Sequence, residues 1–183
     1  MCKALCSKSH KNINLKTFDS NILTIDQRHP DILNAIVNDP IKVERADLLF
    51  RASEHNFSAA AFHEKCDNKN DTLIIIRTEF GKTIGGYAHN PWDSGSLWLS
   101  DSNRRTFIFS LDMGEKFIPQ RDETLILWYN NFGPVFGGGY DIHISDGCNK
   151  KDNLYASFPC RIRGIPTLLR VIKIYFIQFL HIL

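Results

Sequence analysis

The sequence lacks the extremes of composition that mark several classes of protein. Glycine accounts for only 11 of 183 residues, and no heptad pattern runs along the chain, which excludes collagen and argues against a coiled coil. No apolar run reaches the roughly 20 residues that a spanning helix needs. Aromatic residues make up 11% and apolar residues 43%, as in ordinary globular chains. A chain of this length is about one domain and can bury roughly 70% of its unfolded surface.

Signals for disulfides and export are also scarce. The five cysteines are an odd number, no C-x-x-C motif occurs, and the start has no secretory signal. We therefore expect reduced thiols and an intracellular, cytoplasmic protein, with a mitochondrial location as the alternative because residues 1–16 carry no acid. Cys2, Cys6 and His10 are spaced four apart, but three ligands do not close a zinc site. No metal is expected.

Catalytic motifs are missing as well. The glycine-rich segment 133–139 does not lead into Gly-Lys-Ser/Thr and a helix, so tight backbone geometry is favoured over phosphate binding. No G-x-S-x-G elbow occurs. His63 and Cys66 could share a helix face, which would allow metal or thiol chemistry. The favoured interpretation is structural: the helix is half-buried, and the strand at 141–145 has a solvated face. Metal or thiol chemistry there would need partners from elsewhere, for which the candidates are Asp141, His143 and Asp146.

Charge is distributed unevenly along the chain. The net charge of +2 is the sum of +4 over residues 1–16, −6 over residues 17–160 and +4 over residues 161–183. The acidic middle has no basic stripe interleaved with aromatic residues, so a nucleic-acid partner is not expected. Residues 168–183 hold 12 apolar residues among 16. They could form a core-packing segment with one or two buried strands, a membrane-surface anchor, or an altered end.

Periodicity and turn residues predict mainly strands, with helices early in the chain. A helix is expected over residues 30–38, and another follows Ser58 as N-cap. Because short strands follow at hairpin spacing, we predict an α+β protein with two packed antiparallel sheets, a β-sandwich with a few short peripheral helices. Strands are expected at 46–52, 72–78, 83–88, 106–111, 124–129 and 141–145, with a turn at 79–82 and loops at 89–103 and 130–139.

The tryptophans are candidates for contact with a partner, because aromatic side chains dominate interface hot spots. Trp128 lies in an apolar run and is expected in the core. Trp92 and Trp98 lie in the polar segment 89–103, where exposure of either one would be informative.

Several motifs in order resemble the TLDc domain. They are LLFRASEHNFSAAAFHEKCDNKNDTLIIIRT, IGGY, PW, TFIFSL and FGPVFGGGYDIHISDGCN, within a match from about Phe18 to Phe158. The resemblance is to fungal and protist members, often found behind BTB and BACK modules. It implies a domain at 18–160, between a basic tail at 1–17 and an atypical basic apolar segment at 161–183. That segment replaces the family's usual acidic-apolar last strand.

The resemblance also implies a function. The family is associated with protection against oxidative damage and with binding of the vacuolar-type proton ATPase, and it has no established catalytic machinery or cofactor. We therefore expect a non-enzymatic protein-interaction domain. The alternatives are a thiol-dependent redox protein using Cys66 and His63, and a membrane-surface module using residues 161–183. The carried-over motif positions are expected to define the fold: Phe62, Cys66, Gly85, Gly86, Gly133, Phe136, Gly137, Gly138 and Asp141.

Overall fold

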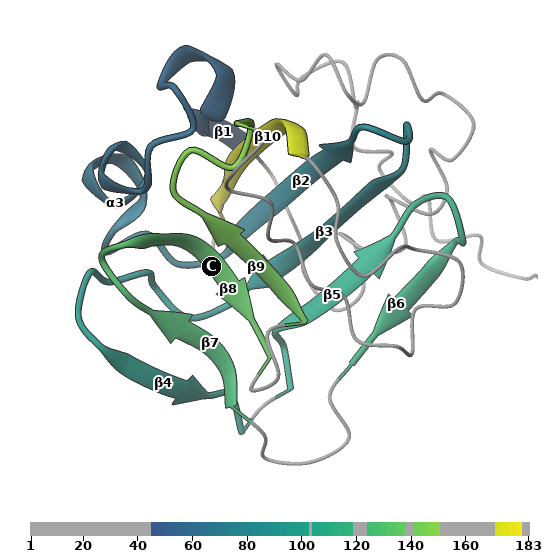
Figure 1. Ribbon diagram of the computed structural model, residues 1–183. Coiled ribbons are helices and arrows are strands. Elements are labelled where there is room, and N and C mark those ends of the chain that lie inside the picture. The colour runs from purple at the N-terminus through teal and green to yellow at the C-terminus, as the bar shows by residue number, and fades with distance from the viewer. Residues whose placement is uncertain (1–44, 103, 119–123, 138–140, 151–170, 181–183) are drawn as a thin grey trace, which may run out of the picture.

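The protein is an α+β sandwich of two antiparallel sheets, as the sequence predicts (Figure 1). The computed structural model describes residues 45–102, 104–118, 124–137, 141–150 and 171–180. One sheet has six strands in the order β1-β10-β2-β3-β5-β6, and the other has four in the order β4-β7-β8-β9. Figure 1 shows the smaller sheet packed across the larger one, with α3 at one end.

The larger sheet contains the two long apolar strands TLIIIRT and VIKIYFIQFL. Its bounds are β1 Arg45–Arg51, β10 Val171–Leu180, β2 Thr72–Thr78, β3 Thr83–Ala88, β5 Phe107–Ser110 and β6 Glu115–Phe117. The smaller sheet contains β4 Leu97–Ser100, β7 Thr124–Trp128, β8 Phe132–Phe136 and β9 Ile142–Ser145. The short helix η2 spans Ala52–Glu54, and α3 spans Ala59–Cys66.

The strand β10 lies inside the larger sheet rather than at its rim. It pairs with β1 on one side and with β2 on the other, both antiparallel. Figure 1 shows it in yellow between these two strands. Of the three interpretations of the C-terminal segment, the structure thus supports a sheet strand for Val171–Leu180. The predicted domain boundary at residue 160 stays a prediction.

The sandwich interior follows the two-residue period of the strands. Along the larger sheet Ile74 pairs with Gly86, and Gly86 pairs with Ile108. All three face the smaller sheet, where the core contains Phe136 and Ile142. The alternate residues of β2 are buried as well, which explains why its sequence is apolar without alternation.

The segment 130–139 was predicted to be a loop, and this is wrong for residues 132–136, which form β8. Gly133 and Pro134 argue against a strand in the sequence, because proline has no N–H to donate to the hydrogen bonds between strands. The pairing of β8 with β9 shifts register between Phe132 and Val135, so the proline lies at an irregularity of the ladder.

The polar segment 89–103 was also predicted to be a loop, yet it contains β4. Two residues of β4 are apolar and exposed, a pattern that is not typical of a strand with one buried face. The three-residue β6 was not predicted either. The helix expected at 30–38 lies outside the described residues.

Candidate functional site

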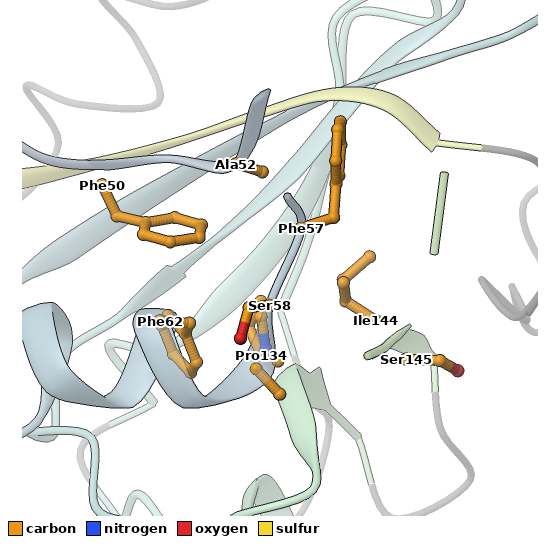
Figure 2. Close-up of a pocket in the computed structure, with 10 residues that line it drawn as sticks. Phe50, Ala52, Phe57, Ser58, Phe62, Pro134, Ile144 and Ser145 are labelled. Carbon is orange, nitrogen blue, oxygen red and sulfur yellow. The ribbon is translucent and has the colours of Figure 1, made fainter. Parts of the chain in front are cut away.

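The motif segments meet around a hollow between β1, the start of α3, β8 and β9 (Figure 2). The hollow has a cavity volume of about 10 Å³, room for about one water molecule and far below the roughly 300–1,000 Å³ of small-molecule sites. Its wall is mostly apolar, so it offers few polar groups to orient a ligand. The lining residues are Phe50, Ala52, Phe57, Ser58, Ala59, Phe62, Gly133, Pro134, Ile144 and Ser145.

The start of α3 beside this hollow is already satisfied by the protein itself. The backbone N–H of Ala61 donates to Ser58 Oγ at 3.3 Å, as the predicted N-cap requires. The backbone N–H of Ala59 donates to Asp146 Oδ1 at 2.7 Å. Because a carboxylate occupies the positive end of the helix, the hollow does not present a vacant anion site there. Asp146 instead joins α3 to the turn after β9.

His63 joins the other side of α3 to the turn between β7 and β8. Its Nδ1 lies 2.7 Å from Asp67 Oδ1, and its Nε2 lies 3.0 Å from the carbonyl oxygen of Phe132 and 3.1 Å from that of Tyr129. The side chain is buried. Both ring nitrogens therefore face oxygen acceptors, which assigns His63 a structural role instead of activation of a thiol.

The thiols of this region are deeply buried. Cys66 has no exposed surface, and burial raises the pKa of its thiol well above the ordinary value of 9.0. Cys148 is buried too, and burial raises its pKa to about 12. Because the thiolate is the reactive species, both behave as small apolar core residues near neutral pH. This disfavours the redox alternative that used Cys66 with His63.

Gly85 and Gly86 are positions of close approach. A Cβ on Gly86 would lie 2.6 Å from Phe136 Cζ, so this ring of β8 packs directly on the β3 backbone. A Cβ on Gly85 would lie 2.0 Å from the Ile74 carbonyl oxygen and 2.5 Å from Phe109 Cζ. The sequence predicted a bulge or a close approach, and β3 shows the close approach.

The glycine block after β8 has its own geometry. Gly137 has a φ of +79°, and a Cβ there would lie 2.2 Å from Asp141 Oδ2. A Cβ on Gly133 would meet Ile144 Cγ2 at 3.2 Å. Gly138 lies outside the described residues. These contacts give a physical reason for the motif residues, while their assignment as fold-defining positions stays a prediction.

A polar cluster lies where β2 begins and β3 ends. The carboxylate of Asp71 accepts from Tyr87 Oη and Asn70 Nδ2, and its Oδ1 lies 2.8 Å from His89 Nδ1. Arg105 Nη1 lies 3.2 Å from His89 Nε2. Burial, followed by the Asp71 hydrogen bond, raises the pKa of the Tyr87 phenol above its ordinary 10.0. Sequence reasoning missed this cluster, because its members lie up to 35 residues apart and share no motif.

The tryptophans of the segment 89–103 have opposite environments. Trp92 is 1% exposed and donates from Nε1 to Thr72 Oγ1 at 2.8 Å. Its ring meets Phe62 and Phe136 edge-on, which links α3 to β8. Trp98 on β4 is 40% exposed, and its neighbour Leu97 is 54% exposed. The side chain of Trp128 lies outside the described residues.

Among the described residues, no three histidine, cysteine or acidic side chains converge on a point where a metal ion could bind. The same part of the chain contains no helix that is both long and apolar enough to span a membrane. The predicted candidates Asp141, His143 and Asp146 do not join His63 and Cys66 in such a group.

The structure is a small two-sheet sandwich, and the motif residues Phe62, Cys66, Gly85, Gly86 and Phe136 are buried in it. The family model of the TLDc domain matches residues 14–170, and the chain belongs to the TLDc domain family. TLDc domains are in general non-catalytic protein-interaction modules. No curated protein gives a significant match.

Proposed function

We propose that this domain acts by binding a protein partner, with β4 as the main contact. The observation that carries the proposal is the exposure of Leu97 and Trp98, at 54% and 40%, on this strand. In the described smaller sheet β4 lies at the edge, because it pairs with β7 only. An edge strand presents main-chain groups to a partner strand.

The chemistry of β4 suits such a contact. Tryptophan is among the residues that contribute most to binding when a partner covers them. Natural sheet edges are commonly blunted by lysine or proline, and Leu97–Ser100 contains neither. A protein partner that binds at β4 would therefore bury the exposed apolar pair, Leu97 and Trp98.

For the partner we propose subunits of the vacuolar-type proton ATPase, and for the cellular role protection against oxidative damage in the cytoplasm. The support is family membership, since these are the roles associated with TLDc domains. The membrane-surface alternative is less favoured, because Val171–Leu180 of that segment is paired on both sides in the larger sheet.

The test is capture of purified proton-pump subunits by the full chain, by one doubly substituted variant and by one singly substituted control. The variant Leu97→Ser/Trp98→Ser removes the proposed contact. The matched control is Phe80→Ser, because Phe80 is 60% exposed but lies in the turn between β2 and β3. We expect capture by the wild type and the control, and at least a tenfold loss with the β4 variant. Equal capture by all three proteins would refute the contact, and capture by none would refute the partner.

A further inference from the structure

The turn that follows β4 is held in one shape by a buried acid. Asp101 is 5% exposed, and its Oδ2 accepts from the backbone N–H of Arg105 at 2.9 Å and of Thr106 at 2.8 Å. The N–H of Arg104 donates to the Asp101 carbonyl oxygen at 3.0 Å. These three bonds tie the backbone of residues 104–106 to Asp101.

Arg104 adopts a backbone conformation that a large side chain rarely takes. Its φ is +53°, in the left-handed region, and its side chain is exposed. Residues held in this region persist where the surroundings fix them, and they cluster at sites of function. Here the strained residue presents a cation to solvent.

The guanidinium of the neighbouring Arg105 is oriented by His89 and Asp71. Because His89 Nδ1 faces the Asp71 carboxylate, its Nε2 accepts from Arg105 Nη1 at 3.2 Å. Arg105 Nη2 lies 3.9 Å from Asp71 Oδ1, and the Arg105 side chain is 35% exposed. Asp71 and Asp101 are 6% and 5% exposed, whereas the Arg104 side chain is exposed and that of Arg105 is 35% exposed.

We propose that Arg104 and Arg105 form a recognition site for a carboxylate on an acidic segment of a protein partner. A guanidinium held in a fixed orientation binds carboxylates through paired N–H donors, with little ordering cost on binding. The turn follows β4 directly, so the site lies beside the contact strand of the proposed function, on which this inference rests. The proposal specifies the chemistry of the partner, an acidic segment.

The experiment measures anisotropy of a fluorescein-labelled hexaglutamate peptide with the full chain at fixed ionic strength. The test variant is Arg104→Glu, which keeps the Arg105 network intact. The matched control is Lys150→Glu, an exposed position with the same change in net charge. Urea unfolding midpoints confirm that both variants fold. We expect at least tenfold weaker binding for Arg104→Glu and a change of less than twofold for the control.

The outcomes separate this site from the proposed function. Equal weakening by the two variants would show nonspecific attraction and overturn the site. Stronger Arg104-dependent binding to phosphatidylserine vesicles than to hexaglutamate would also overturn it, in favour of a lipid ligand. If Arg104→Glu still captures proton-pump subunits and binds the peptide like the wild type, the site is wrong while the function stands. If the wild type captures no subunit but binds the peptide through Arg104, the function is wrong while the site stands.

Discussion

The Phe136 ring packs directly on the backbone of Gly86, which leaves no space for a side chain at position 86. The Phe136 ring is 1% exposed and occupies the space that any side chain at position 86 would need. Gly85 differs, because the nearest atom to its hypothetical Cβ is the Ile74 carbonyl oxygen in the neighbouring strand. A side chain can move, whereas a main-chain carbonyl in a ladder cannot move without breaking its pairing.

The variant Gly86→Ala should lose about 1–3 kcal/mol of unfolding free energy through overpacking. Adding Phe136→Leu should recover part of that loss, because it removes the ring that clashes. The same second substitution should not rescue Gly85→Ala. Urea denaturation of the four proteins measures this, with the exposed Gly95→Ala as control. Equal rescue at both positions would contradict the assigned contacts.

Two buried thiols and one buried phenol with raised pKa values make the unfolding free energy depend on pH in the alkaline range. Cys66 and Cys148 have raised pKa values relative to 9.0, and Tyr87 relative to 10.0. The native state retains these protons at pH values where the unfolded state releases them. The stabilisation is therefore complete below the unfolded pKa values and is lost as the pH rises above them.

We expect the unfolding free energy to fall between pH 9 and pH 11. The variant Tyr87→Phe should lose the part of the slope above pH 10, about 1.4 kcal/mol per pH unit for one proton. Its stability relative to the wild type is measured by urea titration at pH 8, 9, 10 and 10.5. A constant difference across this range would show that Tyr87 titrates alike in both states.

At the scale of elements, α3 is stabilised mainly by contacts at its N-terminus and by the His63 side chain, because the helix is short. Eight residues make a marginal helix in water. Ser58 and Asp146 satisfy its first N–H groups, and His63 binds the carbonyls of the β7–β8 turn. The helix is thereby attached to both β8 and β9.

The variant His63→Ala should lose about 2 kcal/mol of unfolding free energy, because it removes a buried side chain together with its contacts to Asp67 and to the carbonyl oxygens of Tyr129 and Phe132. Hydrogen exchange should increase in α3 and in the β7–β8 turn and remain slow in β2. The adjacent Glu64→Ala, at an exposed position of the same helix, serves as control. Similar losses for both variants would argue that helix propensity, not the bridge, is responsible.

The elements that sequence reasoning found are those whose cause is local. A Ser58 cap before AAAFHEKC and the run TLIIIRT gave α3 and β2 with the bounds observed. β4 was missed because its four residues lie in a segment that is otherwise polar, and β8 because it contains Gly133 and Pro134. In the site, the motif residues could be found by resemblance. The Asp71 cluster could not, since its partners meet only after β2, β3 and β5 pair.

At the scale of the whole molecule, the larger sheet depends on β10. The family match ends at residue 170, and β10 lies beyond it, paired between β1 and β2 in the sheet. Without this strand, β1 has no described partner and β2 has an unpaired edge.

Ending the chain after residue 170 should abolish the cooperative thermal transition or lower its midpoint by at least 10 °C, which corresponds to more than about 3 kcal/mol for a domain of this size. Ending it after residue 180 keeps β10 and serves as the control. Circular dichroism against temperature decides between them. Unchanged melting of the shorter chain would place β10 outside the folding unit.

The pairing of Arg45 with Leu180 spans 135 residues of sequence, so β1 waits for a partner that is made much later. At a synthesis rate of about 5–20 residues per second, the wait on the ribosome is roughly 10 s. During that time the edge of β2 is open to other chains, as is common for sheets closed by distant strands. Nascent chains of this protein should therefore be substrates for ribosome-associated chaperones until β10 emerges.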